Sequence, residues 1–178
     1  MPEEIEVPTE HLHESLQEAA EKSSNRWILM VALTAAILAV LAAVASLLAS
    51  YHVNEAMIEQ LKSSDQWAYY QAKGIKHAVL ESKIELLKSL NKESTSQDQI
   101  KLTEYTQQQK EIELIAREAE KSSAEHMEVH HILAKGVTLF QIAIAIAAIA
   151  VLTKKKWMWY GSILLGLGGI FFLLQGII

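Results

Sequence analysis

Three apolar runs constrain this chain more than any other feature, at residues 27–50, 133–153 and 157–178. The first and third carry no charged side chain, the second has only Lys135 near its start, and Lys154–Lys156 separates the last two. An α-helix rises 1.5 Å per residue, so about 20 apolar residues cross the hydrocarbon core of a bilayer. The runs therefore predict three transmembrane helices.

A polar, charge-rich segment at residues 51–132 joins the first two runs. Residues 91–98 gather Asn, Ser, Thr and Asp and contain no apolar side chain, which is typical of a turn. The segment therefore predicts an antiparallel helical hairpin. Each arm carries a stripe at helical spacing that would face the other arm or a neighbouring protomer. The first stripe is Ile58, Leu61, Asp65, Ala68, Ala72, Ile75, Val79, Ser82, Leu86 and Ser89, and the second is Tyr105, Ile112, Ile115, Ala119, Ser122, Val129 and Leu133.

Small side chains recur every three or four residues in the first and third spans. In lipid, faces of this kind let helices approach closely and pack, within a protomer or between protomers. They are Ala32, Ala35, Ala39, Ala42, Ser46 and Ala49 in the first span, and Ser162, Gly166, Gly169 and Gly176 in the third.

The basic tripeptide Lys154–Lys156 predicts the orientation of the chain in the membrane. Short loops rich in Lys stay in the cytoplasm. Span parity then places the N-terminus on the same side, beside Lys22 and Arg26, and the hairpin outside the cytoplasm. The expected fold is an all-α membrane protein with three transmembrane helices and a long antiparallel extramembrane helical hairpin between the first and second. It comprises a cytoplasmic leader with a short amphipathic helix (1–26), the first span (27–50), the hairpin (51–132, turn 91–98), the second span (133–153), the basic loop (154–156) and the third span (157–178).

Several function classes are disfavoured by what the sequence lacks. The chain has no Cys, and no phosphate-binding loop, nucleophile elbow or zinc-protease motif. Acids and bases interleave at a net charge of −5, so no basic stripe points to nucleic acid. No Asp, Glu, Arg or His lies inside a span, which argues against a proton-coupled carrier. We expect no enzyme and no cofactor.

One histidine cluster is a candidate site. His126 and His130 are four residues apart on one helix face, and His52 follows the first span, so the hairpin would bring the three together at its base. Such a set could bind Zn²⁺ or another divalent ion. Alternatively it could form a pH-sensitive cluster, or simply histidines at a surface. The sequence leaves these three alternatives open.

Two short strings carry a resemblance to a known family. They are Trp67-Ala68-Tyr69-Tyr70-Gln71-Ala72-Lys73, followed by Ile75-Lys76, and the leader string VPTEHLHE at residues 7–14. With the overall plan, they resemble a family of small bacterial membrane proteins catalogued as domain of unknown function 4337. The resemblance implies a bacterial protein with three spans and supplies no activity.

Together these patterns predict a multi-pass protein of the bacterial inner (cytoplasmic) membrane with a cytoplasmic N-terminus. The expected partners are the lipid bilayer, further copies of the chain, and a protein partner at the hairpin or the N-terminal helix. The favoured function is a self-associating scaffold or accessory subunit that presents the hairpin outside the cytoplasm. The alternative is an oligomeric ion channel or pore with the hairpin as vestibule or gate.

Overall fold

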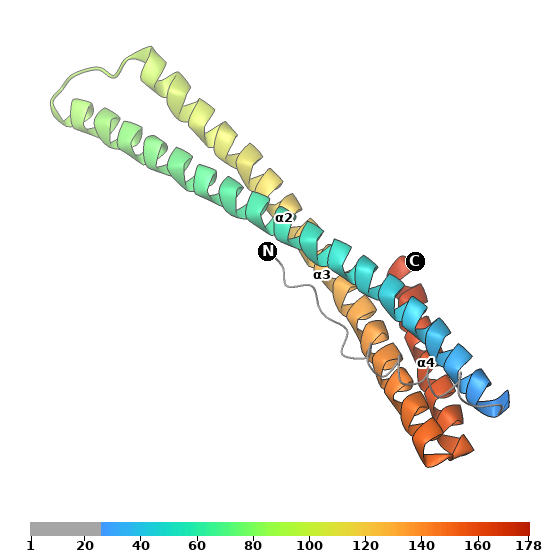
Figure 1. Cartoon of the computed structure of the whole chain (residues 1–178). Coiled ribbons are helices and arrows are strands. Elements are labelled where there is room, and N and C mark those ends of the chain that lie inside the picture. The colour runs from blue at the N-terminus through green and yellow to red at the C-terminus, as the bar shows by residue number, and fades with distance from the viewer. Residues whose placement is uncertain (1–25) are drawn as a thin grey trace. The chain divides into compact units, whose positions relative to one another are not determined.

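The computed structural model describes residues 26–178, which are helical apart from two short connections. Three long helices pack antiparallel: α2 (Arg26–Ser89), α3 (Ser96–Thr153) and α4 (Lys156–Ile177) (Figure 1). Each contains a stretch long and apolar enough to cross a membrane. The all-α prediction is thus confirmed, while the predicted leader helix within residues 1–26 lies almost wholly outside the described residues.

Contacts divide the described residues into two units. The helix-bundle unit comprises the residues up to Val53 together with Glu128–Ile178, and the hairpin unit comprises Asn54–Met127. Both α2 and α3 continue without interruption through these limits, so no loop separates an apolar segment from the hairpin arm that follows it.

Small residues on α2 form the core of the helix-bundle unit. The buried positions follow a regular alternation of four and three residues, so they lie on one helix face. Against this face pack Phe140 and Ile144 of α3 and Leu173 of α4. Of the predicted small-residue face, Ala35, Ala42 and Ala49 are buried in this packing surface, and Ala32, Ala39 and Ser46 are half-buried beside it. The buried α2 residues are Val31, Ala35, Leu38, Ala42, Ala45 and Ala49.

Glycines let α4 approach its neighbours in the same unit. A Cβ built on Gly169 would lie 2.6 Å from Cε1 of Phe140, and one on Gly166 would lie 2.6 Å from Cδ2 of Leu38. A Cβ on Gly176 would come equally near Leu133, at 2.6 Å from its Cδ2. These side chains occupy the space that any larger residue would need, as the small-residue face predicts.

The two connections are shorter than predicted, and both follow the same backbone pattern. Residues 90–95 join α2 to α3, against a predicted turn at 91–98, because Ser96 and Asp98 already lie in the first turn of α3. Asn91 has a φ of 54°, its N–H donates to the carbonyl of Lys88, and the N–H of Lys92 donates to that of Leu87. This is a Schellman motif, which satisfies carbonyls at the end of α2.

The hairpin unit uses a different face of α2 from the one predicted. Its buried residues include Ala56, Ser63 and Ile84 on α2 and Ile112, Ala116, Ala119 and Ser123 on α3. Each of the three on α2 lies two positions from a member of the predicted stripe, a rotation of about 200° on a helix of 3.6 residues per turn. Of the two predicted alternatives for the first stripe, contact with the other arm is therefore wrong, and contact with a neighbouring protomer stays a prediction. Of the second stripe in this unit, Ile112 and Ala119 are buried, Tyr105 and Ser122 are half-buried, and Ile115 is exposed.

Candidate functional site

The predicted histidine site divides between the two units. His130 belongs to the helix-bundle unit, where its Nδ1 lies 2.9 Å from the carbonyl oxygen of Ala49. Because a carbonyl only accepts hydrogen bonds, Nδ1 is the donor in this contact. His52 is in the same unit and makes an edge contact with Tyr51, with ring centroids 5.3 Å apart. His126 belongs to the hairpin unit.

The metal hypothesis for His52, His126 and His130 gains no support from the described residues. Across residues 26–178, no group of three or more His, Asp or Glu side chains is arranged to hold a metal ion. Histidines that bind metals often donate one ring N–H to a backbone carbonyl, as His130 does to Ala49. The same hydrogen bond also holds α2 and α3 together, so it does not by itself indicate a metal site. The site stays a prediction, and a metal content near zero after purification without chelator would remove it.

Residues of the family-like string lie along the interface between the hairpin arms. Lys73 donates to Oε1 of Gln108 at 2.6 Å, and its ammonium lies 5.3 Å from the ring centroid of Tyr69 and 5.4 Å from that of Tyr105. Cations over aromatic faces at these distances attract the ring electrostatically. Gln108 and Tyr105 lie on α3, so this lysine joins the two arms through two partners.

Trp67 of the same string also joins the two arms. The guanidinium of Arg117 on α3 lies 5.6 Å from its ring centroid, and Tyr70 contacts it edge-on at 5.5 Å. Deeper in the hairpin unit, Ser123 donates to the carbonyl of Ala56 at 2.7 Å. Lys73, Trp67 and Ser123 thus each connect the two arms of the hairpin.

Asp98 holds the two arms together beside their connection. Both its carboxylate oxygens accept from Nζ of Lys83 at 2.9 Å. That hydrogen bond holds the pKa of Asp98 below its ordinary value, against the opposing effect of burial; the positive charge of Lys83 adds to the lowering. The N–H of Asp98 also donates to the carbonyl of Thr95 and fixes the start of α3.

The predicted stripe on α2 is left on the outer surface of the hairpin unit, and we call it the exposed seam. All ten of its members are exposed. Its large apolar side chains have more than half of their surface exposed, and a row in which seven of ten residues are apolar is typical of an interaction surface. The values are 55% for Ile58, 66% for each of Leu61, Ile75 and Val79, and 61% for Leu86.

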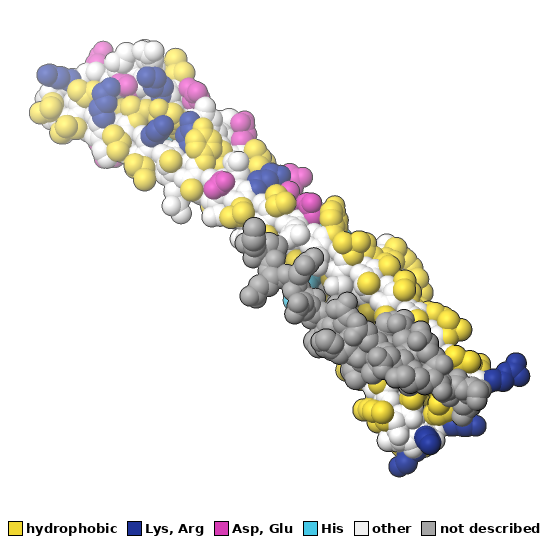
Figure 2. All heavy atoms as spheres, in the orientation of Figure 1, with side chains coloured by type: hydrophobic (Ala, Val, Ile, Leu, Met, Phe, Trp, Pro, Cys, Tyr) yellow, Lys and Arg dark blue, Asp and Glu magenta, His cyan; other side chains and the backbone are white. Residues whose placement is uncertain are grey.

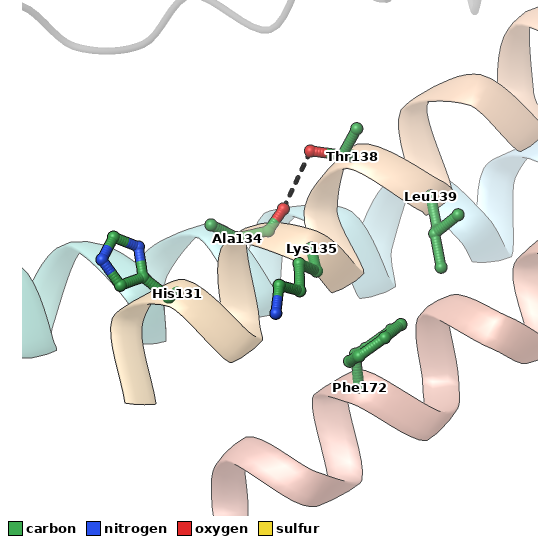
Figure 3. Close-up of a pocket in the computed structure, with 6 residues that line it drawn as sticks. All are labelled: His131, Ala134, Lys135, Thr138, Leu139 and Phe172. Carbon is green, nitrogen blue, oxygen red and sulfur yellow. Dashed lines mark hydrogen bonds between the residues drawn. The ribbon is translucent and has the colours of Figure 1, made fainter. Parts of the chain in front are cut away.

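An open groove of about 630 Å³ lies between α3 and α4 in the helix-bundle unit (Figure 3). His131 and Lys135 of α3 line its polar end, and Leu139 of α3 and Phe172 of α4 line its apolar end. No pattern in the sequence predicts this groove. The four-residue spacing of His131 and Lys135 was visible, but the opposing Phe172 comes from a helix distant in sequence.

These observations define a class: a helical protein with three candidate membrane-spanning helices, whose polar hairpin interior is internally satisfied. Residues 27–178 match the family model described as domain of unknown function, DUF4337. The chain belongs to this family, as the string at residues 67–76 suggested; the leader string at 7–14 lies outside the matched residues. No curated protein and no solved structure matches the chain.

Proposed function

We propose that this protein is a non-enzymatic, multi-pass protein of the bacterial inner membrane that self-associates and presents its hairpin outside the cytoplasm as a scaffold or accessory subunit. Three candidate spans support the membrane location. The exposed seam supports self-association, and it is the observation that carries the proposal. Its residues alternate by three and four along α2, which is the spacing of a coiled-coil interface.

The geometry of a membrane suits this seam to a second copy of the chain. Copies inserted with the same topology present their α2 helices parallel, so each seam position meets its own counterpart. Ile75 and Val79 would then form knobs-into-holes layers. Asp65 would face Asp65, which limits the affinity through like-charge repulsion and leaves association reversible. Relief of that repulsion by substitution is a signature that only a parallel seam would show.

The orientation rests on charges and aromatic rings at one end of the helix-bundle unit. Trp27 and Trp159 both pack against the cluster formed by Val31, Ala35, Ala147, Ala148 and Val151. This places the start of α2 and of α4 together with the end of α3. Lys and Arg side chains gather at that end, beyond a band of hydrophobic atoms (Figure 2). Trp residues mark a membrane interface on either side, and a positive loop is typical of the cytoplasmic side.

Single-cysteine variants test self-association directly, because the chain contains no Cys. In native membranes under mild oxidation, Val79→Cys should form a disulfide-linked dimer, since a parallel seam brings the two thiols face to face. Leu114→Cys is the matched control: Leu114 is as exposed, at 69%, but lies on α3 outside the seam. Adding Ile75→Lys should abolish the crosslink, and adding Asp65→Asn should strengthen it.

A protein that stays monomeric in membranes, or that crosslinks equally through both cysteines, would contradict the proposal. A ring of four or more copies with ion flux in reconstituted vesicles would instead favour the pore alternative. Inside the second and third spans, two polar side chains bond within the chain. Ser162 donates to the carbonyl of Ala143 at 2.7 Å, and Thr138 donates to that of Ala134 at 2.9 Å. Such bonds favour packing over conduction.

A further inference from the structure

The groove between α3 and α4 combines a cationic end with an apolar end. The side chains of Lys135, Leu139 and Phe172 project into the space between the helices (Figure 3). His131 lies one turn before Lys135 on the same face of α3. A volume of about 630 Å³ is within the range of sites that hold small ligands.

The polar groups of the groove are able to bind an anion. Among residues 26–178, no acidic side chain forms an ion pair with Lys135, so its ammonium is available. Thr138 gives its hydroxyl proton to the carbonyl of Ala134 and has no donor left. Recognition of an anionic group therefore falls to the ammonium of Lys135, with an imidazole N–H of His131 as the second donor.

Position along α3 connects this anion site to the bilayer. Lys135 is the last charged residue before the uncharged stretch 136–153. A lysine at the end of a span extends its ammonium to the level of lipid headgroups, while its stem stays among apolar groups. Beyond it, Leu139 and Phe172 provide an apolar wall at acyl-chain depth.

We propose that this groove binds one anionic phospholipid, whose phosphate contacts Lys135 and His131 and whose acyl chain lies against Leu139 and Phe172. A free phosphate would satisfy the cationic end and leave the apolar end without a partner. The inference rests on the membrane location in the proposed function and not on self-association.

Lipid binding to the purified full-length protein in detergent micelles tests the site. Native mass spectrometry measures the occupancy of the first lipid, with phosphatidylglycerol and phosphatidylcholine as probes. We expect about tenfold tighter binding of phosphatidylglycerol, as one charge-assisted hydrogen bond would give. Lys135→Gln should remove this preference and Lys135→Arg should keep it. Because Lys135 is exposed, neither variant should disturb the fold.

Two matched controls separate the groove from general attraction to basic side chains and apolar surfaces. Lys156→Gln removes a lysine at the other end of the spans and should leave the preference intact. Phe172→Ala should weaken the binding of both lipids, whereas Phe171→Ala should not, because Phe171 is 64% exposed and does not line the groove.

Equal losses in Lys135→Gln and Lys156→Gln would overturn the proposal. Inorganic phosphate that binds as tightly as the lipid would also overturn it, because the apolar end of the groove would then contribute nothing. Carbonate extraction of membranes distinguishes failure of the proposed membrane location from failure of the proposed lipid site. A protein released by carbonate would refute the membrane location itself. An integral protein without lipid preference would refute only the groove.

Discussion

Single atoms decide how closely α4 packs in the helix-bundle unit. Phe140 is fully buried, and Gly169 leaves room for its ring. Gly161 lies on the same helix, and a Cβ there would meet nothing within 4 Å. The sequence marks Gly169 as a member of a small-residue face, but only the packing shows which side chain fills the space above it.

Gly169→Ala should therefore destabilise the protein, while Gly161→Ala should not. The new methyl group would lie 2.6–3.0 Å from three atoms of a ring that cannot move away, and overpacking of this kind costs about 1–3 kcal/mol. The free energy of unfolding in mixed detergent micelles measures the difference. If both variants unfold alike, the close contact between α3 and α4 does not exist.

Asp98 should make the stability of the hairpin depend on acidic pH. Its folded pKa lies below its unfolded value of about 3.9, so the unfolded state takes up a proton first as the pH falls. The stabilisation is full above the unfolded pKa and is lost as the pH falls through the lowered, folded pKa. Wild type should thus melt above Asp98→Asn at pH 6, and the gap should close towards pH 3.

Other carboxylates also titrate in this range, so the comparison needs a matched variant. Glu113 forms an exposed pair with Arg117 at 2.9 Å on one helix, and Glu113→Gln should leave a smaller gap at pH 6. A gap for Asp98→Asn that persists unchanged at pH 3 would show that the effect does not come from the carboxylate charge.

At the scale of the element, α2 carries two stripes with the same heptad spacing in the hairpin unit. One runs through Ala56, Ser63 and Ile84 and is buried; the other is the exposed seam. The seam is the more apolar of the two stripes, and for this reason apolar periodicity in the sequence indicates it, and not the buried stripe, as a contact surface. The hairpin instead buries the stripe whose polar groups find partners, such as the carbonyl of Ala56 bonded to Ser123. The apolar stripe is thereby left for a partner.

The two connections between helices show a second limit on what the sequence predicts at this scale. Asn and Lys at positive φ end both long helices, with Lys154 at 55° repeating the geometry of Asn91. Asparagine tolerates this conformation and its sequence context predicted a turn. Lysine does not favour it, and here the carbonyls of Ala150 and Val151 accept from the N–H groups of the connection. A turn at 154–156 was predicted from charge, not from backbone preference.

At the scale of the whole molecule, orientation in the membrane follows from the basic loop. Ser94→Cys, in the connection between the hairpin arms, should react with an impermeant maleimide added to intact spheroplasts. Glu10→Cys, in the leader, should react only after permeabilisation. Because Glu10→Cys leaves the three lysines that set the orientation in place, this variant is a suitable control. Labelling of Ser94→Cys only after permeabilisation would reverse the topology.

The sequence by itself determined the number of long helices, their approximate limits and the family. Uncharged apolar runs, a turn-rich interval and a basic tripeptide are local signals, and local signals suffice to define helices and their ends. It also marked the small-residue faces as packing surfaces, because close approach depends on side-chain size alone.

Tertiary structure decided which face of each helix meets which neighbour. Two stripes of equal spacing on α2 could each pack against α3. Which one is buried depends on hydrogen bonds and ring contacts with α3, and no local sequence pattern encodes these contacts. The groove is of the same kind, since Lys135 and Phe172 meet only when α4 folds back along α3. Contacts between residues far apart in sequence therefore decided both the surface proposed for self-association and the site proposed for lipid.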